Sequence, residues 1–160
     1  MPPPYLGHCL CGQVQFQLNA EPLTCYACHC RDCQRRTGGA MRLVLWVARQ
    51  NLQVLAGEAV LLTFHGSPGR PRRARACAAC DTRLWAEPAA QPDLAILFPG
   101  TLKESHRFSP IAHLWVRSAL PWVILPEDVA RFDTQPSDPG ELIRLWQAAH
   151  GNTSSAMPGS

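Results

Sequence analysis

The chain has 160 residues, a formal net charge of +3, 46% hydrophobic residues and 17% charged residues. This length fits one globular domain and leaves no room for a second domain of ordinary size. The low content of charged residues excludes a coiled coil and a highly charged disordered polymer, and no apolar run approaches the ~20 residues that a membrane-spanning helix needs. We therefore expect one folded domain without a membrane span.

The clearest strand comes first in the chain, at residues 13–18, where apolar and polar residues alternate. This period of two places Val14, Phe16 and Leu18 on one buried face. Further strand-like runs lie between clusters of Gly, Pro, Asn or Ser, at residues 42–48, 59–64, 82–86, 94–98 and 112–117. Short strands with frequent turns predict a mainly β domain built on an antiparallel sheet.

Helix is scarce before the C-terminal end of the chain. There, Asp138 is a candidate N-cap, Pro139 suits the first helical position, and Glu141 follows as an acidic residue. Four apolar residues would share the face that packs on the sheet: Leu142, Leu145, Trp146 and Ala149. We expect residues 134–139 to form a linker before this short helix, and the small, polar residues 151–160 to be disordered.

The eight cysteines decide between two classes of small domain. Residues 1–5 carry neither the basic region nor the apolar stretch of ~7–15 residues typical of a secretory signal, so we expect a cytoplasmic protein. In that reducing compartment thiols remain available to bind metal, whereas disulfide frameworks belong to secreted chains. The sequence therefore favours metal binding over disulfide bonds.

Two close pairs of cysteines each supply half of a tetrahedral zinc site. The simplest pairing joins Cys9 and Cys11, beside the first strand, to Cys77 and Cys80. A zinc ion that joins such distant segments restrains the unfolded chain and contributes directly to the free energy of folding. This site is expected to be structural.

A central group of cysteines supplies a second candidate site. Cys28, Cys30 and Cys33 could hold one zinc ion and leave its fourth position to water or a ligand, which distinguishes a catalytic site from a structural one. An open zinc can bind a substrate thiol and lower its pKa, so that the thiolate can attack a carbonyl carbon. Cys25 leaves an alternative open, because a fourth thiolate would close the site.

His29 lies between two candidate ligands, and we expect its side chain to point away from the metal, in a supporting or surface position.

Four segments occur in one order along the chain: Gly-His-Cys-Leu-Cys-Gly at 7–12, Cys-His-Cys-Arg-Asp-Cys at 28–33, Cys-Ala-Ala-Cys at 77–80 and His-Leu-Trp-Val at 113–116. Together they resemble the glutathione-dependent formaldehyde-activating enzyme family over about residues 5–133. The resemblance implies a mainly β, zinc-binding domain over those residues. We expect the linker and C-terminal helix at 134–150 and the disordered tail at 151–160 to follow it.

The resemblance also implies two zinc ions and their ligands. The structural ion would be held by Cys9, Cys11, Cys77 and Cys80. The second would be held by Cys28, Cys30 and Cys33, at or near the place where glutathione binds. Because family members use these three cysteines, we expect Cys25 to remain unligated, as a small buried residue.

The activity that the resemblance implies is that of a zinc-dependent carbon–sulfur lyase. It would reversibly join glutathione and formaldehyde, or a related small aldehyde, to give S-(hydroxymethyl)glutathione, with Cys28, Cys30 and Cys33 as the catalytic residues. The alternative is a non-catalytic zinc-binding scaffold or a glutathione-binding carrier. The partners are then a small-molecule thiol and an aldehyde, and nucleic acid is not expected because the chain has no basic extension.

Residues within and directly after the central cysteine motif are candidate glutathione contacts: Arg31, Arg35, Thr37, Gly38 and Gly39. The forked guanidinium groups, with that of Arg36, suit carboxylates, although a solvated helical face would explain them equally well. The glycines could bring backbone N–H groups close to an anionic ligand, or could form the ordinary C-terminal cap of a short helix.

Two further features bear on the sites. The family usually has glycine where this chain has Asp81, and we expect the structural site to survive because Asp tolerates positive φ better than most residues. An arginine-rich segment at 70–75 follows a Ser-Pro-Gly turn and contains no aromatic residue. It is expected to be a charged loop rather than a nucleic-acid site, since proteins that bind single strands add aromatic stacking surfaces.

Overall fold

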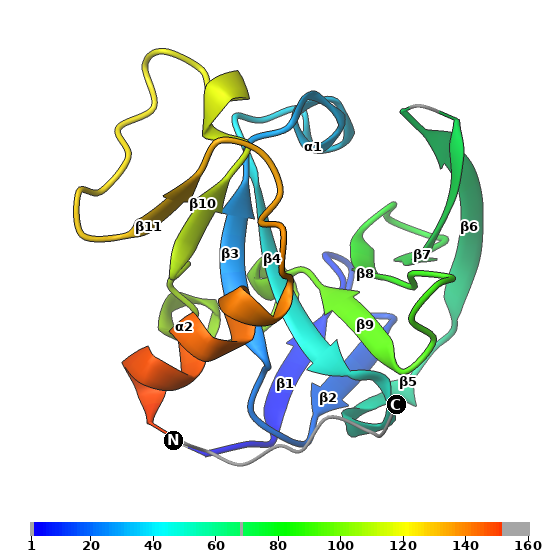
Figure 1. Ribbon diagram of the computed structural model, residues 1–160. Helices are drawn as coiled ribbons and strands as arrows, with labels where there is room; N and C mark the ends of the chain where they lie inside the picture. The colour runs from blue at the N-terminus through cyan, green and yellow to red at the C-terminus, as the bar shows by residue number, and fades with distance from the viewer. Residues whose placement is uncertain (1, 68, 152–160) are drawn as a thin grey trace.

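The computed structural model describes residues 2–67 and 69–151. In this part of the chain the strands form two sheets (Figure 1). The smaller sheet is antiparallel and has the order β1-β2-β5. Its strands are β1 Tyr5–His8, β2 Gln15–Leu18 and β5 Leu52–Ala56.

The larger sheet has the order β11-β10-β3-β4-β9-β8-β7-β6. Neighbouring strands are antiparallel, except that β10 runs parallel to both β3 and β11. The strands are β3 Thr24–Cys28, β4 Arg42–Ala48, β6 Ala59–Gly66, β7 Arg70–Cys77, β8 Arg83–Ala86, β9 Leu94–Leu97, β10 Ala112–Leu114 and β11 Ala130–Phe132. The expected mainly β fold with a largely antiparallel sheet is confirmed.

Two α-helices accompany the sheets in the described residues: α1 Arg31–Thr37 and α2 Gly140–His150. Short 3-10 helices lie at Arg49–Asn51, Pro99–Thr101, Ser105–Arg107 and Val116–Ser118. None of the helices in the described part of the chain is long and apolar enough to cross a membrane.

The core has two parts, one on each side of the central strands β3 and β4. On one side Phe16 of β2 packs edge to face on Trp85 of β8, with ring centroids 5.8 Å apart. On the other side Tyr26 of β3 packs on Trp46 of β4, again at 5.8 Å. Every residue of β3 is buried, so its sequence carries no alternation of polar and apolar residues. This is why the pattern along the chain does not predict β3, the strand that leads directly into the central cysteines.

The C-terminal helix is present as expected. The Asp138 carboxylate accepts a hydrogen bond from the Gly140 N–H at 2.9 Å, and the Thr24 hydroxyl donates to the Leu142 carbonyl at 2.9 Å, which fastens α2 to β3. Leu142 and Trp146 are buried, but Ala149 is exposed because it lies in the solvent-facing last turn. Residues 152–160 of the expected disordered tail lie outside the described residues.

The expected strand at 112–117 is too long. It ends at Leu114, because Trp115 has a φ of 59° and this left-handed conformation breaks the extended backbone. Other boundaries differ by one or two residues: the strands expected at 13–18, 82–86 and 94–98 are shorter in the structure, and that expected at 59–64 extends to Gly66.

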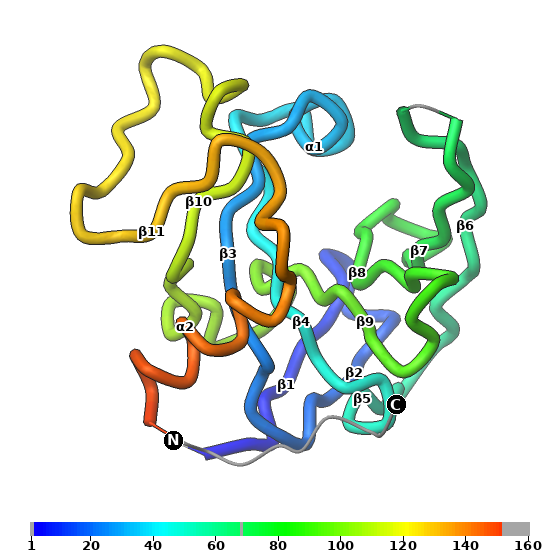
Figure 2. Tube along the Cα trace, viewed as in Figure 1, coloured from blue at the N-terminus to red at the C-terminus, as the bar shows by residue number. Residues whose placement is uncertain are grey.

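The expectation of a charged loop at 70–75 is wrong. This segment belongs to strand β7, which pairs with β6 on one side and β8 on the other (Figure 2). Ala74 and Ala76 are buried on one face, while Arg73 and Arg75 point to the opposite face. The alternation of arginine and alanine therefore indicates a strand. The high charge of the segment favoured a loop instead.

We expect Gly7→Ala to lower the free energy of unfolding by about 1–3 kcal/mol, the usual cost of overpacking. A Cβ at Gly7, in the middle of β1, would collide with the ring of Phe16, which is fully buried and has no room to move. Chemical denaturation would measure the difference. Gly100→Ala is the matched control, since no heavy atom lies within 4 Å of its added Cβ. Equal stability of the two variants would contradict the packing described for β1.

Candidate metal centres

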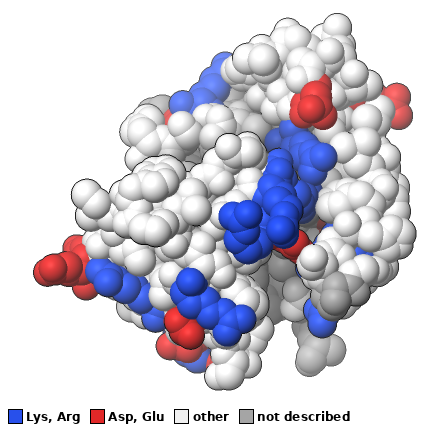
Figure 3. Space-filling view, turned by 90° about the horizontal axis from the view of Figure 1, so that it is seen from above, with Lys and Arg blue, Asp and Glu red and all other residues white. Residues whose placement is uncertain are grey.

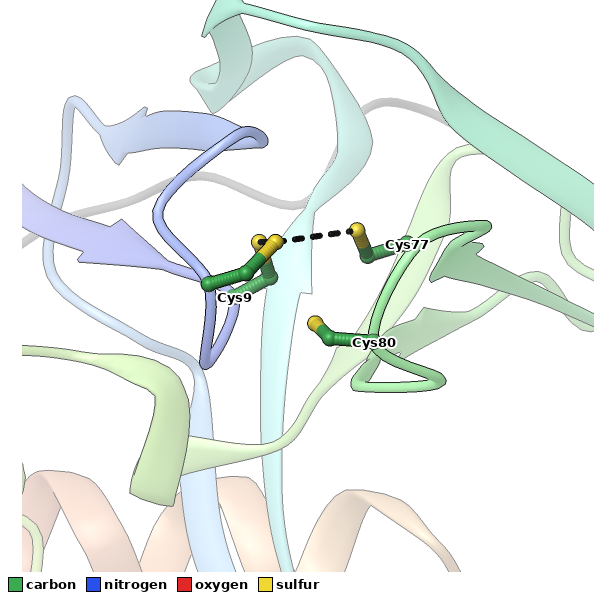
Figure 4. Close-up of side chains that lie close together, drawn as sticks. Cys9, Cys77 and Cys80 are labelled. Atoms are coloured by element: carbon green, nitrogen blue, oxygen red, sulfur yellow. Dashed lines mark hydrogen bonds between the residues drawn. The ribbon is translucent and has the colours of Figure 1, made fainter.

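The first cysteine cluster joins the loop after β1 to the turn between β7 and β8. Figure 4 shows Cys9 reaching from the first of these segments toward Cys77 and Cys80 on the second. The Sγ atoms of Cys9 and Cys11 lie 3.5 Å apart, and those of Cys11 and Cys77 lie 3.8 Å apart. Four Sγ atoms at tetrahedral corners ~2.3 Å from a zinc ion would be about 3.8 Å from one another. With all four Sγ atoms within 4.8 Å of each other, the cluster is placed so that it could hold one metal ion.

Backbone hydrogen bonds fix both halves of this cluster. The Val14 N–H donates to the Cys9 Sγ at 3.3 Å, and the Asp81 N–H donates to the Cys77 carbonyl at 3.0 Å. Thr82 links the halves, since its hydroxyl accepts the Leu10 N–H at 3.0 Å and lies 3.2 Å from the Cys80 Sγ. That hydroxyl, followed by backbone N–H groups, lowers the pKa of Cys80 to about 5. The turn thus favours the thiolate form that metal binding requires.

Asp81 adopts the conformation expected for the residue that replaces glycine. Its φ is 60°, in the left-handed region where Asp is tolerated and most other residues are strained. The tight turn from Cys77 to Cys80 is therefore formed in this chain without glycine.

The second cluster is formed where β3 ends and α1 begins. Cys28 is the last residue of β3, Cys30 is the N-cap of α1, and Cys33 lies in the first turn of the helix. Their Sγ atoms lie within 4.8 Å of one another, and the Cys33 N–H donates to the Cys30 Sγ at 3.4 Å. The extended backbone of Cys30, with a ψ of 154°, turns the chain from strand into helix and brings the three side chains together.

Crowding of three thiols makes this cluster suited to a cation. The Cys28 and Cys33 thiols donate hydrogen bonds to the Cys30 sulfur, which lowers the pKa of Cys30 to about 2. The pKa of Cys28 is raised well above its usual range, because its thiol donates to Cys30 and Cys33. The thiols alone thus favour one thiolate, whereas a divalent cation would stabilise all three. The donor set and its spacing fit zinc.

Cys25 does not close the second cluster. It lies three residues before Cys28 on β3, and this odd spacing turns the two side chains to opposite faces of the sheet. The Cys25 thiol is fully buried and donates to the Phe108 carbonyl at 3.6 Å. Burial raises its pKa to about 12, as expected for a thiol that remains neutral in an apolar core.

His29 points away from the cysteine cluster, but it is not on the surface. Its ring is fully buried, and its Nε2 lies 2.9 Å from Nδ1 of His113 on β10. Burial lowers the pKa of both histidines, so a neutral pair that shares one N–H donor satisfies the contact. Sequence reasoning missed this pairing, although both residues belong to the ordered motifs, because no spacing rule links β3 to β10.

Gln34 is a further residue that sequence reasoning missed. Its side-chain amide donates at 2.8 Å to the His29 carbonyl and at 2.8 Å to the Ser118 carbonyl. These bonds hold α1 against the segment that follows β10. Gln34 is buried in the middle of a helix whose other residues are mostly polar. Because glutamine is itself polar, the sequence gives no signal that this side chain is buried.

A pocket of about 420 Å³ lies against the outer side of α1. It is lined by Arg31, Gln34, Arg35, Gly38, Gly39, Ala40, Leu120 and Trp122. Four of the five candidate glutathione contacts therefore lie together. Thr37 does not line the pocket, because its hydroxyl donates to the Cys33 carbonyl at 2.9 Å and accepts the Gly39 N–H at 3.1 Å. Gly38 caps the helix with its N–H on the Gln34 carbonyl, so the glycines open the pocket through their missing side chains rather than offering these N–H groups to it.

Comparison with known proteins identifies a family and a similar solved structure. A family model described as glutathione-dependent formaldehyde-activating enzyme matches residues 4–118. A search of curated proteins found no match. A solved crystal structure of a Rhodobacter sphaeroides protein is similar at 16% identity, with a TM-score of 0.49, over 79% of this chain and 98% of that one.

Asp81 can be tested by substitution in both directions. We expect Asp81→Gly to keep the metal content and raise the free energy of unfolding by up to about 1 kcal/mol, because glycine has no Cβ to strain at positive φ. Asp81→Val should lower it by more than about 1 kcal/mol, since a β-branched residue is disfavoured there. Denaturation of the metal-loaded protein would measure both. A valine variant as stable as the parent would contradict the left-handed turn.

The separation of Cys25 from the metal clusters predicts an unchanged metal content. Cys25→Ala should retain the zinc stoichiometry of the parent chain, measured by elemental analysis, while losing about 1 kcal/mol of stability for the buried sulfur. Loss of one ion per chain from a variant that remains folded by circular dichroism would show that Cys25 is a ligand.

Proposed function

The chain belongs to the glutathione-dependent formaldehyde-activating enzyme family, and on that premise we propose that it is a zinc-dependent carbon–sulfur lyase. It joins glutathione reversibly to formaldehyde, or to a related small aldehyde, as S-(hydroxymethyl)glutathione. The observation that carries the proposal is the cluster of Cys28, Cys30 and Cys33, which offers three sulfur donors rather than four. A centre with three protein ligands can accept a substrate, whereas a centre with four is closed.

The two clusters take different parts in this proposal. Cys9, Cys11, Cys77 and Cys80 hold a structural zinc ion that fastens the loop after β1 to the β7–β8 turn. The Cys28, Cys30 and Cys33 thiolates hold the second ion. When bound there, zinc supplies a position for the glutathione thiol and lowers the pKa of that thiol.

The pocket on α1 is the proposed binding site for the rest of the tripeptide. Arg31 and Arg35 offer guanidinium groups for the glutathione carboxylates, and the exposed ring of Trp122 offers an apolar wall. Consecutive helix residues lie about 100° apart, so Cys30 and Cys33 occupy the face next to that of Arg31 and Gln34. The proposed site for the tripeptide and the three-cysteine cluster thus lie next to each other on α1.

The reaction needs no redox step. The sulfur of glutathione attacks the carbonyl carbon, a carbon–sulfur bond forms, and the π electrons of the carbonyl bond move to its oxygen. That oxygen takes up one proton, which balances the proton that the thiol has released. The residues of the chain contribute by holding the thiol and by orienting the tripeptide, since proximity alone accelerates a reaction between two bound partners.

The decisive experiment compares adduct formation with the spontaneous reaction. We expect zinc-loaded protein to accelerate S-(hydroxymethyl)glutathione formation, followed by nuclear magnetic resonance, and Cys30→Ala to abolish the acceleration because only two sulfur donors remain. Cys25→Ala is the matched control, with a buried cysteine removed outside the cluster. A parent protein that binds glutathione without accelerating the reaction would be a carrier, and one that does neither would be a scaffold.

The pocket on α1 is tested by binding. Arg31→Ala and Trp122→Ala should each raise the Kd for glutathione about tenfold, since a charge-assisted hydrogen bond or a covered aromatic face is worth about 1.5 kcal/mol. Isothermal titration calorimetry would measure the affinities. Arg144→Ala on α2, an exposed arginine outside the pocket, should leave the Kd unchanged. Equal affinities in all three variants would place the glutathione site elsewhere.

A further inference from the structure

A second group of arginines lies on the other side of α1 from the glutathione pocket. Figures 1 and 2 show α1 facing the β6–β7 hairpin across the strands of the larger sheet. Seen from above, basic side chains gather in the hollow at the centre of this face (Figure 3). The group, which we call the basic cleft, comprises Arg36 of α1, Arg42 of β4, Arg72 of β7 and Arg83 of β8.

Aromatic rings hold three of these guanidinium groups in place. Arg36 lies over the ring of Phe64 at 4.2 Å from its centroid, and Arg83 lies over the same ring at 5.5 Å. Arg42 lies over the ring of Phe98 at 4.5 Å. Stacking fixes the flat face of a guanidinium and leaves its N–H edge available for a planar partner such as a carboxylate.

No carboxylate forms a salt bridge with an arginine of the basic cleft in the described residues. Arg42 is only 8% exposed, and the Nε and Nη2 atoms of Arg36 are buried without a hydrogen bond. The salt bridges found in residues 2–67 and 69–151 involve none of the four arginines. Burial, followed by repulsion from Arg42 and Arg83, lowers the pKa of Arg36 to about 10. Buried donors of this kind are normally satisfied, so the two unpaired donors of Arg36 are available to a ligand in the cleft.

The basic cleft adjoins the three-cysteine cluster. The register of the sheet places Arg42 directly opposite Cys28, which puts both side chains on the same face. Arg36 follows Cys33 by three residues on α1 and therefore lies near it on the helix surface. Three thiolates and one zinc ion carry a net charge of only −1 between them. The four arginines exceed that charge even after Asp32, which lies near Arg72 at the hairpin tip, is counted.

We propose that Arg36, Arg42 and Arg83 bind a substrate carboxylate beside the three-cysteine cluster, and that the preferred aldehyde of this protein is therefore a small acidic one. The inference rests on the proposed function. Formaldehyde is neutral and gains nothing from buried cations, whereas the carboxylates of glutathione have Arg31 and Arg35 on the far side of α1. An aldehyde that carries a carboxylate next to its carbonyl group, such as glyoxylate, would place its reactive carbon toward the cysteines while its carboxylate pairs with the guanidinium groups.

Kinetics with two aldehydes test the proposal. With glutathione held constant, the parent protein should show a higher kcat/KM for glyoxylate than for formaldehyde, each corrected for the spontaneous reaction. Arg36→Gln and Arg83→Gln should lower the value for glyoxylate at least about tenfold and leave that for formaldehyde within twofold. Arg73→Gln, on the outward face of the neighbouring strand β7, is the matched control and should change neither. Acceleration with formaldehyde alone, equal in all variants, would overturn the proposal while leaving the lyase function intact.

Binding provides the second readout. Glycolate, the unreactive alcohol analogue of glyoxylate, should bind the zinc-loaded parent in calorimetry and bind Arg36→Gln and Arg83→Gln at least about tenfold more weakly. This result would support the carboxylate site even if no aldehyde were turned over, in which case the lyase function and the preference for an acidic aldehyde would fail together. The other substrate that carries carboxylates is glutathione, and the binding of S-methylglutathione tests whether those carboxylates occupy the cleft. If its affinity, rather than that of glycolate, falls in the same variants, the cleft serves the thiol substrate and the inference of an acidic aldehyde is overturned.

Discussion

The convergence of cysteine sulfur atoms into two clusters is the constraint on which the structure depends. Cys9 and Cys77 are buried in one cluster, where thiolates would be close enough to repel one another. A bound cation would stabilise thiolates at such distances, and it would couple metal binding to the folding of the segments that the clusters join. The loop after β1 and the β7–β8 turn meet where four sulfur donors converge and where the Leu10 N–H donates to the Thr82 hydroxyl. The second cluster, by contrast, is local, since β3 and α1 are already joined by the chain.

The geometry of one strand decides whether the second cluster offers three or four sulfur donors. β3 is buried on both faces, so residues that alternate along it belong to two separate cores. Cys25 is directed into the core that contains Phe16 and Trp85, and Cys28 into the other. A spacing of two or four residues between these cysteines would have placed a fourth thiol on the face of the cluster. The odd spacing keeps that thiol away, and α1 has a pocket on one side and the basic cleft on the other, next to the three sulfurs.

Much of this arrangement could be predicted from residue patterns. Cysteine spacing separates the two clusters correctly, and the ordered motifs identify the family, because metal ligands and tight turns tolerate few alternatives. The alternation of apolar and polar residues predicts the half-buried strand β2. It does not predict β3, which has no exposed face, or β7, in which two buried alanines lie among arginines. The pairing of His29 with His113 and the gathering of Arg36, Arg42 and Arg83 depend on the order of strands in the sheet. No local pattern specifies that order, so these contacts appear only in three dimensions.

X-ray absorption at the zinc edge tests the central claim most directly, because it counts the sulfur neighbours of the bound ions. One ion with four sulfur ligands and one with three give an average of about 3.5 sulfur atoms per zinc, with a lighter atom completing the second site. Saturation with glutathione should raise the average to about 4 as its sulfur replaces that atom. An average of 4 before glutathione is added, with no change afterwards, would show that the second centre is closed and would contradict the account.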